Sequence, residues 1–147
     1  MVEGATSIAR TNIHASVVAL DAERGVLITG PSGSGKSLLA LRLMAFGAHL
    51  VADDRVDLSV EDGHLIASAP PQIAGRIEAR AVGLLRAEAL EQARIILCVN
   101  LDEIETERLP NHRKDRVLGV ELPLVLRVQH GHFDVAILQW LKGGRWA

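Results

Sequence analysis

The sequence predicts an α/β domain in which a mixed sheet is flanked by helices, and three features carry this prediction. A buried strand at 25–29 runs into a glycine-rich loop and then into a helix from Lys36 to about Phe46. Gly47 ends that helix and a second strand follows at 48–52, which completes a right-handed strand–helix–strand unit with parallel strands. Asp62-Gly63, between two short extended runs, indicates a hairpin and therefore antiparallel strands as well.

The remaining elements follow in order along the chain. Residues 13–20 predict a strand that a polar turn at 21–25 joins to the next strand as a hairpin. The runs 56–60 and 65–67 form the Asp-Gly hairpin, good helix formers occupy 84–93, and 94–101 is a second buried strand. A charge-rich connection (103–115), two extended runs around Pro123 (117–128) and a terminal helix at 134–142 complete a single domain over 1–147.

Composition excludes several classes of function. The net charge of −2, with 23% charged residues, gives no basic field for nucleic acid or an anionic membrane surface. We expect neither a membrane anchor nor a secretory signal, because there is no long apolar run. The lone Cys98 lies in an apolar run and cannot form an internal disulfide, which fits a cytoplasmic location.

The glycine-rich loop carries the most specific signal in the chain. It completes the pattern G-x-x-x-x-G-K-[ST], with Gly30, Pro31, Ser32, Gly33, Ser34, Gly35, Lys36 and Ser37. Such a turn lets consecutive backbone N–H groups converge on phosphate oxygens, Lys36 reaches the β- and γ-phosphates, and Ser37 can ligate Mg²⁺. The positive end of the following helix points at the same anion. The sequence therefore predicts binding of a nucleoside triphosphate with Mg²⁺.

Asp53 and Asp54 follow the strand that closes this unit, so we expect them at the same sheet edge as Lys36 and Ser37. Neighbouring residues of an extended segment point to opposite sides, so one carboxylate should face the phosphates and the other should face elsewhere. A carboxylate near the γ-phosphate can accept a hydroxyl proton or hold Mg²⁺.

Four further residues are candidates for the site. His14 lies on the predicted strand beside the one that leads into the loop, but its register, and so its distance from the loop, stays open. Glu78 and Arg80 lie on one side of an extended segment, where they can serve metal and phosphate or form a surface ion pair. Asp102 follows a hydrophobic strand, as a Walker B aspartate does, and competes for the metal.

Together these residues resemble the catalytic domain of the bacterial HPr kinase/phosphorylase family, whose fold is of the HPr kinase and PEP carboxykinase kind. The resemblance rests on an ordered set of segments at 14–18, 25–37, 50–54, 77–84 and 118–123. The phosphate loop alone is common to many families, but this set, with its upstream histidine and double aspartate, is fairly specific.

The resemblance implies an ATP-dependent serine kinase of HPr or of its nitrogen-system paralogue in a phosphotransferase system. It assigns Asp53 as the base in phosphorylation and as the acid when inorganic phosphate attacks phosphoserine and pyrophosphate leaves. It also brings His14 and Asp54 next to that carboxylate. Lys36 and Arg80 would act on phosphate, and the Mg²⁺ ligands would be Ser37, Glu78 and Asp54.

The chain also departs from the family pattern. The loop after Gly83 is shortened to 84–88, and the segment that usually reads P-x-R-P-G-R-N is here Arg127-Val128-Gln129-His130-Gly131-His132-Phe133. The C-terminal helix is shorter as well. These changes leave open the retention of phosphorolysis, the docking of HPr and the assembly of subunits into a homo-oligomer.

Two other functions fit the same motif. A nucleotide-sensing module would keep the loop without catalysis, and a small-molecule or nucleoside kinase would use Asp102, in place of Asp53, as its metal carboxylate.

Overall fold

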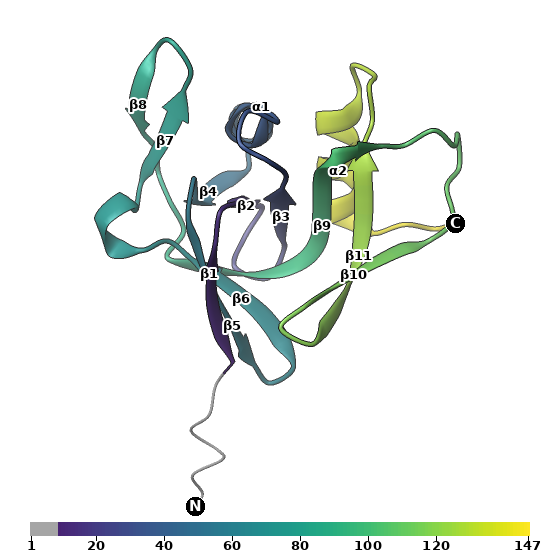
Figure 1. Cartoon of the computed structure of the whole chain (residues 1–147), viewed down its shortest axis with the longest axis horizontal. Coiled ribbons are helices and arrows are strands. Elements are labelled where there is room, and N and C mark those ends of the chain that lie inside the picture. Colours follow the sequence, from purple (N-terminus) through teal and green to yellow (C-terminus); the bar gives the residue numbers. More distant parts are fainter. Residues whose placement is uncertain (1–8) are drawn as a thin grey trace, which may run out of the picture.

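The computed structural model describes residues 9–147, and a single nine-stranded sheet organises this part of the chain (Figure 1). The strand order is β1-β5-β6-β9-β3-β2-β4, with β11 beside β9 and β10 beside β11. The strands are β1 (Arg10–Ile13), β2 (Ser16–Ala19), β3 (Gly25–Thr29), β4 (His49–Ala52), β5 (Val56–Glu61), β6 (His64–Ser68), β9 (Gln92–Ile104), β10 (Arg113–Val117) and β11 (Val120–Arg127). A separate hairpin pairs β7 (Arg76–Ala79) with β8 (Gly83–Arg86), after a 3₁₀ turn at Pro71–Ile73.

The centre of the sheet confirms the predicted mixed architecture. β9 runs parallel to β3 and to β11, whereas β2 is antiparallel to both β3 and β4. Because β2 lies between β3 and β4, these two strands point the same way without pairing, and their carboxyl ends meet at one edge of the sheet. This is the edge at which the phosphate loop was expected.

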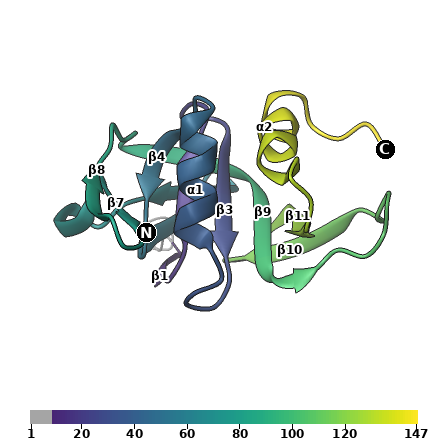
Figure 2. The ribbon, with the colours of Figure 1, turned by 90° about the horizontal axis from the view of Figure 1, so that it is seen from above.

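The two helices cover the same face of the sheet. α1 (Lys36–Ala45) and α2 (Phe133–Gly143) contact each other, and their buried residues share one core cluster with β2, β3 and β9. Strands β5 and β6 contribute to a second cluster, which contains the alternate residues of β2 and β3. Both faces of the sheet are therefore apolar. This agrees with the sequence of β3 (Gly25–Thr29), whose continuous apolar run is typical of a strand buried on both sides. Figure 2 shows α1 between the β7–β8 hairpin and α2.

The predicted strand at 13–20 is divided in the structure. β1 pairs with β5, whereas β2 pairs with β3 and β4, so the chain leaves one part of the sheet for another at His14 and Ala15. The sequence left the position of His14 open. In the structure His14 lies in the break between β1 and β2, two residues before β2 begins.

The helix expected from the good helix formers at 84–93 is wrong. Residues 83–86 form β8, opposite Arg76–Ala79, and β9 begins at Gln92. Helix propensity is a weak preference, and here the ladder with β7 supplies the backbone hydrogen bonds instead. Ala81 adopts a positive φ of 67° in the tight turn between the two strands.

The two extended runs expected around Pro123 form one strand, β11. Its register with β9 begins at Leu124, so the missing N–H of Pro123 removes no bond from that ladder. The turn before it contains Leu118 and Gly119, both with positive φ, and joins β10 to β11 as a hairpin. The expected connection at 103–115 is shorter than predicted, because β9 extends to Ile104 and β10 begins at Arg113. The terminal helix is confirmed as α2.

Candidate functional site

The phosphate loop joins β3 to α1 and depends on glycine at two positions. Gly35 caps α1 in the left-handed region with φ 98°, and a Cβ added there would meet open space. Gly30 has φ 148°, and a Cβ on it would lie 2.6 Å from the hydroxyl of Ser34. The Ser34 Oγ is itself buried and has no hydrogen-bond partner among the described residues. The loop is therefore a tight turn in which, among the described residues, one buried hydroxyl is left free for a ligand.

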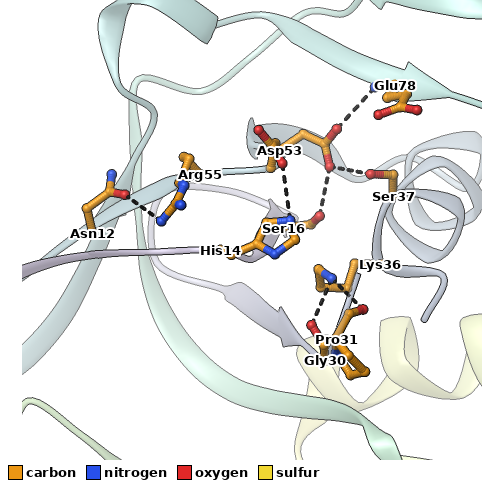
Figure 3. Close-up of polar contacts among 11 residues, drawn as sticks. Asn12, His14, Ser16, Gly30, Pro31, Lys36, Ser37, Asp53, Arg55 and Glu78 are labelled. Atoms are coloured by element: carbon orange, nitrogen blue, oxygen red, sulfur yellow. Dashed lines mark hydrogen bonds and ion pairs between the residues drawn. The ribbon is translucent and has the colours of Figure 1, made fainter. Parts of the chain in front are cut away.

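Lys36 is folded against this loop and is only 6% exposed. Its ammonium Nζ donates hydrogen bonds to the carbonyl oxygens of Gly30 (2.8 Å) and Pro31 (3.0 Å), as Figure 3 shows. Burial lowers the pKa of Lys36, while the negative charges of Asp53 and Asp54 act in the opposite direction. The ammonium therefore lies where a phosphate can replace its two carbonyl partners.

Asp53 is the buried centre of the site, at 5% exposure. Its Oδ1 accepts hydrogen bonds from the hydroxyls of Ser16 on β2 (2.8 Å) and Ser37 on α1 (2.6 Å). Its Oδ2 accepts one from the backbone N–H of Glu78 on β7 (3.1 Å). One carboxylate at the end of β4 thus ties together three other elements, and Figure 3 shows these bonds converging on it. Ser16, which is fully buried, was not identified from the sequence.

Asp54 points away from this centre, as expected for the neighbour of Asp53. It has a positive φ of 72° just after β4, a conformation uncommon for residues other than glycine. Its side chain is 72% exposed, and its Oδ1 lies 3.1 Å from Nε2 of His14. The backbone therefore presents Asp54 and His14 together on the solvent side, while Asp53 stays below.

A cavity of about 550 Å³ collects most of the predicted site residues. Its lining includes His14, Lys36, Ser37, Asp54, Glu78 and Arg80, together with Ser16, Ser32, Gly33, Gly35, Leu38, Leu41, Ala79 and Val82. Asp53 is not among the lining residues; it lies directly behind Ser16 and Ser37 and accepts hydrogen bonds from their hydroxyls. Asp102 is exposed on β9 and lines neither this cavity nor any other described here.

A second cavity of about 310 Å³ lies on the other side of α1. It is lined by Gly35, Leu38, Leu39, Arg42 and Leu101 and by residues of β11, the following loop and α2: Arg127, Val128, Gln129, His130, Gly131, Phe133 and Asp134. The Arg127 guanidinium donates from Nη2 to the carbonyl of Ser34 in the phosphate loop and from Nε to that of Leu101 (3.0 Å). This contact was not predicted from the sequence, in which residues 127–133 were noted only as a departure from the family pattern.

The oxygen atoms around Ser37 suit a small divalent cation. Because the Ser37 hydroxyl donates its hydrogen bond to Asp53, the lone pairs of its oxygen are left for a metal. The carboxylates of Asp54 and Glu78 line the same cavity. Hydroxyl and carboxylate oxygens are the ligands that Mg²⁺ prefers, usually with several waters retained. Within residues 9–147 no group of three or more His, Cys, Asp or Glu side chains forms a preassembled metal centre. Nor is any helix of this region long and apolar enough to cross a membrane.

Known proteins with this arrangement are found by both sequence and structure. The family described as the HPr Serine kinase C-terminal domain matches residues 6–139. An HPr kinase/phosphorylase of Geobacillus thermodenitrificans is 40% identical over 129 residues, which cover 78% of this chain and 42% of the relative. One of Clostridium botulinum is 48% identical over 61 residues, 42% of this chain and 20% of the relative. The chain thus spans less than half the length of these relatives.

A solved structure shows the same fold. The Hpr(Ser) kinase/phosphatase from Coxiella burnetii matches with a TM-score of 0.74 at 27% identity, over 90% of this chain and 94% of that one. The ordered segments from His14 to Pro123, the phosphate loop and the mixed sheet all agree with this likeness. The resemblance inferred from the sequence is confirmed: the chain belongs to the HPr serine kinase C-terminal domain family.

Proposed function

We propose that this protein is an ATP-dependent serine kinase of HPr-type phosphocarrier proteins, acting in the cytoplasm. The observation that carries the proposal is the 550 Å³ cavity, in which the phosphate-loop residues Lys36 and Ser37 lie with Asp54, His14 and Arg80. Phosphoryl transfer depends mainly on positioning and on stabilising negative charge, and this cavity supplies both a cradle and cations. Membership of the family supports HPr as the protein substrate.

We assign the role of general base to Asp54 and a positioning role to Asp53. The resemblance gave the base role to Asp53, but a base must reach the hydroxyl whose proton it accepts. Asp54 lines the cavity and is paired with His14, whereas the oxygens of Asp53 already accept three hydrogen bonds. In this scheme Asp54 accepts the proton of the substrate serine as its oxygen bonds to the γ-phosphorus and the bond to ADP breaks.

The other residues act on the charge of the phosphates. Lys36 exchanges its two carbonyl partners for β- and γ-phosphate oxygens, and Arg80, in the turn of the β7–β8 hairpin, binds the transferred group. Ser37 and Glu78 would hold Mg²⁺, which would neutralise negative charge on the phosphates. Asp54, which the resemblance gives as a third ligand, stays free of the metal in this scheme, because a carboxylate bound to Mg²⁺ is a poor proton acceptor. His14, 3.1 Å from Asp54, orients that carboxylate.

The same site can run in reverse. An oxygen of inorganic phosphate would bond to the phosphorus of phosphoserine as the bond to the serine oxygen breaks. The proton of the attacking phosphate would pass through Asp54 to the serine oxygen, and the products would be serine and pyrophosphate. The serine oxygen is the nucleophile in the kinase reaction and the leaving group in phosphorolysis, so Asp54 accepts its proton in the first reaction and returns one in the second. Phosphorolysis is therefore part of the proposal, and it is tested separately from the kinase reaction.

The test is transfer of labelled phosphate from γ-labelled ATP to purified HPr and to its nitrogen-system paralogue, with Mg²⁺. We expect label on one of these proteins and none when its acceptor serine is replaced by alanine. The Lys36→Ala variant should transfer nothing. Wild-type protein that binds ATP but labels neither carrier would contradict the kinase and leave a nucleotide-sensing module. Release of pyrophosphate from phosphorylated carrier and inorganic phosphate tests the reverse reaction.

A further inference from the structure

We propose that the 310 Å³ cavity between α1, β11 and the loop 128–132 binds the nucleoside part of the triphosphate. The nucleotide would then cross the phosphate loop, with its γ-phosphate on the Asp54 side of α1 and its base and sugar on the Phe133 side. This inference rests on the proposed function, because it assumes that the loop binds a nucleoside triphosphate.

The position of the cavity relative to the loop is the first argument. Gly35 and Leu38, at the start of α1, line both this cavity and the 550 Å³ cavity, so the two spaces lie on either side of the same helix turn. The reacting groups occupy the far cavity, which fixes the γ-phosphate there. A nucleotide held by its β-phosphate at the loop must then direct its nucleoside away from those groups, and this cavity is the space on that side. A third cavity, around Glu105 and Arg145, contains no residue of the phosphate loop.

The direct link to the loop is the second argument. Arg127 lines the cavity and donates a hydrogen bond to the carbonyl of Ser34 inside the phosphate loop. Its second donor reaches Leu101 on β9, which also lines the cavity. The wall of the cavity and the phosphate cradle are therefore parts of one hydrogen-bonded structure.

The lining has the chemistry that a nucleoside needs. Leu38, Leu101, Val128 and Phe133 give an apolar wall against which a planar base can pack. The guanidinium groups of Arg42 and Arg127 can stack on the base or contact the sugar and α-phosphate. The volume lies within the range, about 300–1,000 Å³, of sites that hold small molecules. The chain has few aromatic residues, so stacking on arginine would take the place of an aromatic platform.

Two ligands that differ only in the nucleoside test the inference: Mg²⁺-ATP and inorganic triphosphate with Mg²⁺, titrated by calorimetry. We expect wild-type protein to bind ATP about tenfold or more tightly than triphosphate, because only ATP buries a base. Gly131→Trp should fill the cavity rim, since Gly131 has open space around its Cβ position and no positive φ. This variant should lose the advantage of ATP while its affinity for triphosphate stays within about twofold. Gly143→Trp, a matched change outside the cavities, should leave both affinities unchanged.

A covalent probe locates the base without any substitution. After irradiation with 8-azido-ATP, we expect label in the tryptic peptide 128–142, which contains the loop and the start of α2. Label in the β7–β8 hairpin instead, or equal loss of ATP and triphosphate binding in Gly131→Trp, would overturn the inference and leave the kinase proposal intact. If wild-type protein binds neither ligand, the proposed function fails and the inference fails with it.

Discussion

The two sides of α1 hold the phosphate loop by different means. On the side of β2, β4 and β7, one buried carboxylate, Asp53, accepts hydrogen bonds from three elements. On the side of β9 and β11, one arginine, Arg127, donates to two backbone carbonyls. The first side depends on the identity of several side chains, whereas the second needs only the arginine, because every residue offers a carbonyl. The proposed reaction takes place on the first side, where more side chains must keep their identity.

Asp54→Asn should have the largest effect, a loss of kcat with almost no change in stability. Loss of a general base lowers kcat by about 10²–10⁴-fold. The side chain is exposed, so we expect the free energy of unfolding to change by less than about 0.5 kcal/mol. Transfer assays and urea unfolding of the same preparation measure the two quantities. Wild-type kcat in this variant would refute the assignment of Asp54.

Asp53→Ala should instead damage the fold on its side of α1. It leaves the donors of Ser16, Ser37 and Glu78 without their acceptor, and an unsatisfied buried donor costs about 1–3 kcal/mol. Ser37 can turn to solvent, so we expect a loss of about 2–4 kcal/mol in unfolding free energy. Asp57→Ala, which removes only the exposed bond from Asn12, is the control. A change no larger than the control's would mean that Asp53 does not organise the site.

Arg127→Met should have a smaller effect on stability, and it should act on the other side. Two hydrogen bonds to backbone carbonyls are lost while the apolar stem is kept, so we expect about 1–3 kcal/mol of destabilisation. Affinity for inorganic triphosphate should fall as well, because the Ser34 carbonyl loses its partner. Arg24→Met, which breaks a surface pair with Asp21, is the matched control and should leave triphosphate affinity unchanged. Equal behaviour of the two variants would show that Arg127 does not support the loop.

A pH series tests the end of β9, where the Glu105 N–H donates to the Arg127 carbonyl. Hydrogen bonds from Arg113 lower the pKa of Glu105 from 4.5 to about 2. A carboxylate with a lowered folded-state pKa stabilises the protein above its unfolded pKa and loses that effect as the pH falls through the folded value. Glu105→Gln should therefore be less stable than wild type at pH 7, with the difference vanishing between pH 4.5 and about 2. A difference independent of pH would contradict the ion pair.

The last prediction concerns the reactivity of Cys98, which lies in the central part of β9 between β3 and β11. Burial raises the pKa of this thiol to about 12, so native protein should not react with a thiol reagent at pH 8. Reaction should become stoichiometric in denaturant. Reaction of the native protein at a rate similar to that of free cysteine would mean that the central sheet opens readily.

The phosphate loop, the double aspartate and the mixed sheet could be predicted, because each rests on local pattern: a motif, a strand end or an Asp-Gly turn. The sequence predicted that Asp53 and Asp54 point to opposite sides. It could not predict which of them faces the cavity, because this depends on the positive φ of Asp54, which no local pattern indicates. Ser16 and Arg127 were missed because their partners lie far along the chain. The 84–93 helix was wrong for the same reason, since its competitor was pairing with β7.

The pairing of β3 with β9 has a consequence for synthesis of the chain. Leu27 of β3 lies opposite Cys98 of β9, and Cys98 in turn lies opposite Leu124 of β11. During synthesis, β3 therefore gains its neighbour β9, and β9 its neighbour β11, only after most of the chain has been made. On the ribosome, the hairpin β2–β3 would emerge long before these partners and would expose an unpaired, apolar edge. Such long-range parallel pairing folds slowly. We therefore expect the phosphate loop to reach its binding conformation only after β9 has paired with β3 and Arg127 of β11 has reached the Ser34 carbonyl.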